Sequence, residues 1–509
     1  MFQCCPLKTI GQQSWLYSDA SHLPTRIIDV GTQGGLVHLK EFGGNPPKAH
    51  YICLSHRWSQ SKPLTTTTQT LSKRLEGILI QELSATLRDA ISLTRGFHLQ
   101  YIWIDSLCIL QNSSDDWEIE SAKMCNYYNN SWLTIGAGVE SDNSGIFGHI
   151  TPNNTMQRLL HYSRSTPLNY YQLAVDLGCS NNGGKSNLYF NNEDESIWNN
   201  CAGSLLNDRA WTLQEEALSP RFLSFQPRQT SLRNGDAVHH ESGYSEKLTR
   251  TTFLNLSGSN LMPWRKLVED YSKRKLTIET DKLPAFSGLA QKYQQNGYGI
   301  YLAGLWYYSL KKDLCWWGSA SKLIPSLHRP KQYRAPSWSW ASLDGGIFFY
   351  SVSDKTTSPH LEILDASTQV AGRNPLGQVS SGSLRLRGEL SHQLWKHEKT
   401  PNGTWYWSFA HPLDQHVPND TLSANVPRWN AKLILDIPEG SVASLEIWSL
   451  PIKNNFALVL QEVPNIKGTF TRIGCILSRN RRYEGYMKVD TVTIIWSSMG
   501  RPSDTHNKI

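Results

Sequence analysis

Polar side chains that could do chemistry follow two short apolar runs in the first quarter of the sequence. The run YICLS ends in Ser55 and continues with His56, Arg57 and Trp58, and the run YIWIDSLCI contains Asp105. If both runs are neighbouring parallel strands, their carboxyl ends meet at one edge of a sheet, where open α/β sheets bind ligands. A base, a cation, a flat aromatic ring and a carboxylate would then lie together. The sequence therefore predicts a ligand site at this edge.

Each of these residues also has a structural interpretation. A histidine such as His56 is commonly a hydrogen-bonded structural residue, and a carboxylate at a strand end, such as Asp105, commonly accepts backbone N–H groups. Arg57 and Arg209 could simply pair with carboxylates, and Cys108 beside an apolar run is typical of a small buried hydrophobe. A triad of Ser55, His56 and Asp105 is the weaker hypothesis, because adjacent residues of one strand point to opposite faces.

A second carboxylate, Glu120, stands out on the helix predicted after the second run. That helix should start with Asp115 or Asp116 as its N-cap, and Glu120 shares a face with Trp117 and Met124 at three- and four-residue spacing. The same face should pack against the sheet. A carboxylate on a packed face must be paired or be retained for a function.

Alternating strands and helices are predicted around these residues. Apolar residues at helical spacing predict one helix over 71–94, between strands at 51–55 and 101–109, and WLTIGAG at 132–138 predicts a third strand. Residues 140–205 are polar and rich in Asn and Gly, which indicates long loops. A helix over 211–218, in which Trp211 should be buried against the sheet and Gln214 or Glu215 should reach its edge, precedes the strand RFLSF. This order is typical of an α/β parallel sheet.

The rest of the chain has a different pattern. Helical periodicity returns over 262–312, RAPSWSWASLDGG suggests a pair of short strands, and residues from about 345 to 500 alternate apolar and polar in short runs typical of antiparallel β structure. We therefore divide the chain into an N-terminal segment (1–50), an α/β domain (51–225) with an insertion (140–205), a helical and mixed region (226–345) and a β-rich C-terminal region (346–509).

Composition bounds the class of protein. The 509 residues are 39% hydrophobic and 18% charged, which is typical of a globular chain. Fifty Lys and Arg against 43 Asp and Glu give a net charge of +7 without a long block of like charge, so we expect no nucleic-acid partner. No apolar stretch approaches the roughly 18 residues of a membrane span, and nine cysteines without metal spacing favour a reducing compartment. We expect a cytoplasmic protein without a metal site or a membrane partner.

Three blocks of this sequence resemble, in order and spacing, the signature blocks of the fungal heterokaryon incompatibility (HET) domain. They are YICLSHRW, the segment from YIWIDSLCILQN to SWLTIGA, and DRAWTLQEEALSPRFLSF. The resemblance implies a TIR-like, flavodoxin-like sheet and a role in nonself recognition that ends in programmed cell death. Further segments, such as RAPSWSWASLDG, are similar to the regions that accompany the domain in full-length members.

The same resemblance implies a chemistry, because several TIR domains cleave NAD+ with a glutamate on the helix after a central strand. Glu120 occupies the analogous place, with Asp105 and His56 as the other catalytic candidates. The residues expected to bind NAD+, as a substrate rather than a resident cofactor, are Ser55, Arg57, Trp58 and Arg209. One carboxylate can stabilise the oxocarbenium-like ribose while nicotinamide leaves as a neutral ring.

Two departures weigh against dinucleotide binding. Ser59 stands where the family commonly has a glycine, and the chain has no glycine-rich phosphate loop. The alternatives are a non-enzymatic interaction module that needs an unknown protein partner, and an accessory protein or enzyme of a secondary-metabolite pathway. The resemblance also implies self-association through the HET domain, which we expect the C-terminal β region to control.

Overall fold

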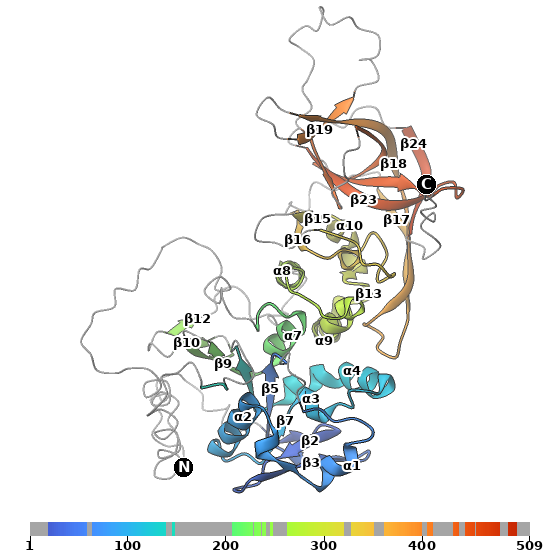
Figure 1. Cartoon of the computed structure of the whole chain (residues 1–509). Helices are drawn as coiled ribbons and strands as arrows, with labels where there is room; N and C mark the ends of the chain where they lie inside the picture. The colour runs from blue at the N-terminus through green and yellow to red at the C-terminus, as the bar shows by residue number, and fades with distance from the viewer. Residues whose placement is uncertain are drawn as a thin grey trace, which may run out of the picture. The chain divides into compact units, whose positions relative to one another are not determined.

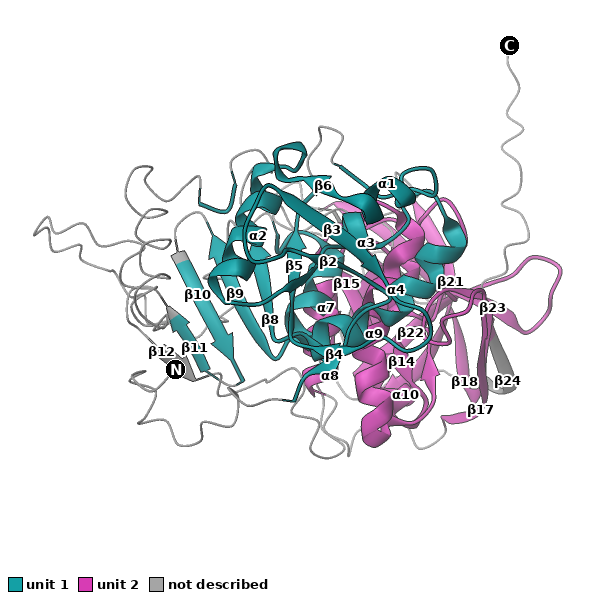
Figure 2. Cartoon of the chain, turned by 90° about the horizontal axis from the view of Figure 1, so that it is seen from below, with its two compact units in different colours: residues 1–255 teal, residues 256–509 magenta. Residues whose placement is uncertain are grey.

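The computed structural model forms two compact units, residues 1–255 and 256–509 (Figure 2). The structure describes residues 19–495 apart from internal gaps, which are 59–63, 139–144, 148–205, 227–228, 236, 241–244, 248–261, 320–326, 351–360, 400–404, 411–430, 437–442, 454 and 479–486. The predicted insertion thus lies almost wholly outside the described residues, as does Ser59.

Unit 1 is built on a ten-stranded mixed sheet with the order β12-β11-β10-β9-β8-β5-β7-β2-β3-β6. Its four central strands, β7, β5, β8 and β9, run parallel, whereas the flanking pairs are antiparallel. The strands are β2 (Arg26–Asp29), β3 (Leu36–Glu41), β5 (Tyr51–His56), β6 (Ile78–Leu79), β7 (Tyr101–Trp103), β8 (Leu133–Ala137), β9 (Arg221–Gln226), β10 (Gln229–Asn234), β11 (Ala237–His240) and β12 (Ser245–Lys247). A separate two-stranded sheet pairs β1 (Ser21–His22) with β4 (Lys48–Ala49).

Continuous apolar runs form the centre of this sheet. Every residue of β5 and of β8 is buried, as expected for parallel strands covered on both faces. Helix α2 (Ala85–Gly96) lies on one side of these strands, and α4 (Ser114–Asn130) with α7 (Ala210–Leu218) lies on the other (Figure 1). The predicted alternation of strands and helices is confirmed, and the N-terminal segment adds β2 and β3 to the same sheet.

Three local predictions are wrong. The helix expected over 71–94 is divided into α1 (Leu71–Glu76), the edge strand β6, the 3-10 turn η3 (Ile80–Glu82) and α2. Gly77 ends α1 with a φ of 152°, a backbone conformation open to glycine, and the Ser84 hydroxyl then caps α2. The strand expected over 101–109 stops at Trp103, because Asp105 begins the short helix α3 (Asp105–Cys108). The N-cap of α4 is Ser113, whose hydroxyl accepts the N–H of Asp116.

Unit 2 begins with helices around an aromatic core. The elements are α8 (Met262–Tyr271), η5 (Glu279–Lys282), α9 (Pro284–Tyr293), the π-helical turn η6 (Gln294–Tyr298), the hairpin β13 (Tyr301–Leu302) and β14 (Leu305–Trp306), η7 (Tyr307–Ser309), α10 (Leu310–Asp313) and the pair β15 (Trp316–Ser319) and β16 (Gly346–Phe349). The indole of Trp264 is fully buried and contacts Phe286, Tyr293 and Trp306. The short strands predicted in RAPSWSWASLDGG are wrong: the segment forms turns and η8 (Trp340–Ser342), which the Ser339 hydroxyl caps.

The C-terminal part of unit 2 is β-rich, as predicted. Its strands are β17 (Glu362–Val370), β18 (Val379–Lys399), β19 (Trp405–Ala410), β20 (Ala431–Leu435), β21 (Ser444–Lys453), β22 (Phe456–Glu462), β23 (Thr469–Ser478) and β24 (Met487–Ile495). The pairing runs from β18 through β21, β22, β23 and β24 back to β18, so five strands close into a ring. All of these pairs are antiparallel except β23 with β24. A core that includes Trp395, Ile447 and Val459 holds the sheet together.

Among the described residues, no helix has the length and apolar character needed to cross a membrane.

Candidate functional site

Most of the predicted site residues gather where the strand order of unit 1 reverses, whereas Glu120 and Arg57 do not join them. Strand β5 lies between β7, which follows it in the chain, and β8, which comes after β7 on the opposite side. The carboxyl ends of β5, β7, β8 and β9 form one edge of the sheet, which we call the carboxyl edge. Open α/β sheets bind ligands in the crevice at such a reversal. Ser55 and His56 end β5 there, and Asp105 follows β7.

Asp105 organises one half of the carboxyl edge. One carboxylate oxygen accepts a hydrogen bond from Trp58 Nε1 at 3.0 Å, and the other accepts the backbone N–H of Ser106 at 2.7 Å. His56 Nδ1 lies 3.8 Å from the second oxygen. The sequence places these residues almost fifty positions apart, and the structure brings them together as predicted. Asp105 therefore fixes the Trp58 ring through a hydrogen bond and lies beside the His56 ring.

Glu215 supplies a second carboxylate on the α7 side. Its side chain is buried, with 6% of the residue exposed. Burial raises the pKa of Glu215 to about 7, while the hydroxyls of Ser55 and Tyr128 and the charge of Arg209 act to lower it. Both protonation states are therefore populated near neutral pH. A carboxyl group in that condition can donate or accept a proton in a reaction.

Two buried hydroxyls beside these carboxylates lack hydrogen-bond partners. Ser55 Oγ approaches Glu215 closely enough to affect its pKa but falls short of hydrogen-bond geometry, and Ser106 Oγ also has no partner. The two residues are 0% and 1% exposed. An orphaned buried polar group costs about 1–3 kcal/mol, so such groups are rarely kept without a role. Their position marks the carboxyl edge as a place where hydrogen-bonding capacity is unused.

Arg209 brings a cation to the same place. It is the N-cap residue of α7, and its Nη1 donates a hydrogen bond of 2.5 Å to the backbone oxygen of His56. Because the guanidinium also acts on Glu215, it lies close to both halves of the site. Arg57, by contrast, is exposed to solvent. The structure therefore brings Arg209 into the cluster and leaves Arg57 at its surface.

Glu120 lies in a different set of contacts. Its carboxylate is 1% exposed, accepts a hydrogen bond from the Tyr127 hydroxyl at 2.8 Å and pairs with Lys123 at 3.0 Å. Within the described residues, no hydrogen bond or ion pair connects it to Asp105 or Glu215. Of the two options that the sequence leaves for this carboxylate, the structure shows pairing. Its predicted catalytic role stays a prediction.

The burial of Trp211 and Cys108 differs from one residue to the other. Trp211 is only partly buried and packs edge-on against Trp117 of α4, at 6.2 Å between ring centroids, so the prediction that it is buried against the sheet is wrong. The adjacent helix α4 covers this part of α7 and takes the ring instead. Cys108 is buried, and burial raises the pKa of its thiol to about 12, which confirms the inert interpretation. The described residues contain no cluster that could hold a metal ion.

Sequence reasoning assigned no role to Glu215 or Tyr128. Glu215 was expected to reach the edge, and that placement holds, but the block RAWTLQEE carries two carboxylates and does not say which one is buried. Tyr128 looks like an ordinary aromatic residue on the packed face of α4. Its hydroxyl donates to the backbone oxygen of Leu54 at 3.3 Å and lies near Glu215. Only the three-dimensional contact of α4 with α7 shows that Tyr128 lies beside Glu215.

Comparison with known families assigns the region that contains this site. Residues 51–215 match the family model described as Heterokaryon incompatibility protein (HET), which runs from the first residue of β5 to Glu215. No curated protein and no solved structure matches the chain significantly. All the cluster residues described above fall inside the matched segment.

Proposed function

Because the chain carries a HET domain over residues 51–215, we propose that it acts in heterokaryon incompatibility, as a nonself-recognition protein whose activation leads to programmed cell death. We further propose that unit 1 hydrolyses the N-glycosidic bond of NAD+. The order β7-β5-β8-β9 supports the TIR-like, flavodoxin-like fold inferred from the resemblance, since that doubly wound order is the flavodoxin-like one.

The observation that carries the enzymatic proposal is the environment of Glu215. It is a buried carboxyl group with a pKa of about 7, at the strand-order reversal and next to the Arg209 cation and the unpartnered hydroxyl of Ser55. Strongly perturbed acids in such positions are enriched at functional sites. We therefore assign the main catalytic role to Glu215 rather than to Glu120, whose carboxylate already has two partners.

The chemistry needs few groups. Water adds to C1′ of the nicotinamide ribose while the N-glycosidic bond breaks, and the bonding electron pair leaves with the nicotinamide nitrogen. Ionised Glu215 would stabilise the positive charge that develops on the ribose and accept the proton of the attacking water. The products are nicotinamide, ADP-ribose and one proton. The Ser55 hydroxyl would bind a ribose hydroxyl of the substrate.

The neighbouring residues suit the rest of a dinucleotide. Arg209 offers a guanidinium for the pyrophosphate, and the Trp58 ring offers a face for a base. Asp105 and His56 would position these groups through the contacts described above. We also propose that HET domains of two copies associate during activation and that another protein supplies the trigger.

The test is incubation of the purified full chain with NAD+, followed by chromatography for nicotinamide. We expect cleavage by wild type, its loss in Glu215→Gln and its retention in Glu120→Gln. Glu76→Gln, which alters an exposed glutamate at the end of α1, is the matched control. Loss of cleavage in Glu120→Gln alone would move the catalytic role to Glu120. Absence of cleavage by the wild type, alone and after enforced dimerisation, would favour a non-enzymatic interaction module.

A further inference from the structure

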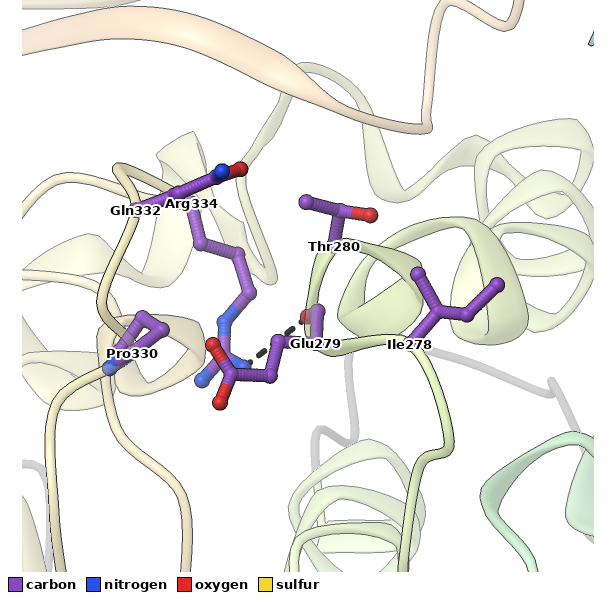
Figure 3. A pocket seen from close by; sticks show the side chains of 6 residues that line it. All are labelled: Ile278, Glu279, Thr280, Pro330, Gln332 and Arg334. Carbon is purple, nitrogen blue, oxygen red and sulfur yellow. Dashed lines mark hydrogen bonds between the residues drawn. The ribbon is translucent and has the colours of Figure 1, made fainter.

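Unit 2 contains a pocket that the proposed function does not use. It has a volume of about 260 Å³ and lies between the start of η5 and the loop 330–334 (Figure 3). Its walls combine apolar and polar side chains, and the six lining residues are Ile278, Glu279, Thr280, Pro330, Gln332 and Arg334. The size suits a small metabolite rather than a nucleotide, because drug-sized ligands occupy larger cavities.

Arg334 provides a fixed positive charge at the inner wall. The residue is 4% exposed, and its Nε donates to the backbone oxygen of Ala341 at 2.8 Å. Its Nη1 donates to the backbone oxygen of Glu279 and to Asp344, both at 3.0 Å, whereas the buried Nη2 has no hydrogen-bond partner. Lys282 also pairs with Asp344, at 3.2 Å, so two cations share that carboxylate. Nη2 has almost no accessible surface, so what the guanidinium offers to the pocket is its positive charge, which Asp344, shared with Lys282, does not fully neutralise.

Glu279 provides the opposite charge in the same pocket. The residue is exposed at the start of η5, and its carboxylate makes no ion pair among the residues that the structure describes. Figure 3 shows its side chain directed toward the space between the 278–280 turn and Pro330. Thr280 and Gln332 add a hydroxyl and an amide to the wall, and Ile278 and Pro330 add apolar surface.

We propose that this pocket binds a small zwitterion, namely a free α-amino acid with an apolar side chain. The carboxylate of the ligand pairs with the positive charge of Arg334, its ammonium pairs with Glu279, and its side chain contacts Ile278 and Pro330. A simple anion would be repelled by Glu279, and a simple cation would be repelled by Arg334. A ligand that carries both charges satisfies both walls.

The test compares three probes that differ in one charged group each. L-leucine carries both groups, 4-methylpentanoate lacks the ammonium, and isopentylamine lacks the carboxylate. We expect isothermal titration calorimetry on the full chain to show that L-leucine binds on the order of tenfold more tightly than either analogue. The reason is that 4-methylpentanoate leaves the charge of Glu279 unpaired, and isopentylamine leaves the charge of Arg334 unpaired.

Variants locate the site. Glu279→Gln should weaken L-leucine binding and leave 4-methylpentanoate unchanged or tighter, which removes the preference for the zwitterion. Glu446→Gln, an exposed glutamate on β21 away from the lining residues, should leave the preference intact. Arg334→Lys should weaken both carboxylate probes, with circular dichroism as the check on folding. Equal binding of all three probes, no binding of L-leucine, or an unchanged preference in Glu279→Gln would each overturn the proposal.

Discussion

Trp58 and Asp105 are joined by a hydrogen bond of 3.0 Å from the indole N–H to the carboxylate, which links the segment after β5 to the first residue of α3. Replacing Trp58 with Phe keeps a ring and removes this donor. We expect the free energy of unfolding to fall on the order of 1 to 2 kcal/mol, because the lost bond ends on a charged group that is partly exposed. Urea unfolding followed by far-ultraviolet circular dichroism measures the change.

The matched control is Trp117→Phe. Trp117 is partly buried and meets Trp211 through its ring, so Phe should preserve most of the contact. If the two variants are equally stable, the hydrogen bond between Trp58 and Asp105 contributes nothing measurable.

The sequence predicted the central elements of unit 1 because their signals are local. Uninterrupted apolar runs mark β5 and β8, and the proline after α7 separates it from β9. The same local reasoning joined α1 to α2, since leucines continue at helical spacing across Gly77. What broke that helix is the pairing of β6 with β3, a contact between residues some forty positions apart that no local periodicity contains.

The titration of Glu215 predicts a pH-dependent stability. Its pKa is raised from 4.5 to about 7, so between these values the folded chain holds a proton that the unfolded chain has lost. Stability from this group is therefore full below pH 4.5, falls as the pH rises toward 7 and stays low above it. Glu215→Gln should remove that slope and raise the free energy of unfolding at pH 8, on the order of 1 to 3 kcal/mol.

Urea unfolding at pH 5 and pH 8 measures the effect, with Glu76→Gln as the exposed control. Identical pH slopes in wild type and Glu215→Gln would show that the carboxyl group is not held in a raised-pKa environment.

Glu120 should behave as a structural residue. Glu120→Gln loses the charge that pairs with Lys123 and keeps only part of the acceptor capacity for Tyr127, so we expect a loss on the order of 1 to 3 kcal/mol in the free energy of unfolding. Tyr127→Phe removes one donor of the same group and should cost less. NAD+ cleavage should persist in both variants. A Glu120→Gln protein with wild-type stability and no cleavage would reverse this assignment.

Two apolar residues of α7 should contribute differently to the free energy of unfolding. Leu213 is fully buried, and Leu213→Ala should cost about 2 to 5 kcal/mol. Trp211 is partly exposed and contacts Trp117 edge-on, so Trp211→Ala should cost less than Leu213→Ala, although the ring is larger. Thermal unfolding of the two variants in parallel decides the order. A larger loss in Trp211→Ala would restore the buried position that the sequence suggested.

The candidate site shows where sequence reasoning ends. His56, Trp58 and Asp105 could be placed together because strand ends in a parallel sheet meet at one edge. The choice between Glu120 and Glu215 could not be made, since both are carboxylates on helices that cover the same sheet. Tyr127 and Lys123 surround Glu120, whereas Ser55 and Tyr128 surround Glu215. These surroundings are decided by side-chain packing alone.

The closed ring of strands in unit 2 makes assembly depend on its last member. Strand β24 pairs with β18 on one side and with β23 on the other, and it follows β18 by more than a hundred positions at Ser383 and Ile495. During synthesis, β18 is therefore complete long before the strand that covers its edge exists. Until then two unpaired strand edges are available to other chains, which is a known route to aggregation. The addition of β24 is thus the step that covers the edges of β18 and β23 left open in the nascent sheet.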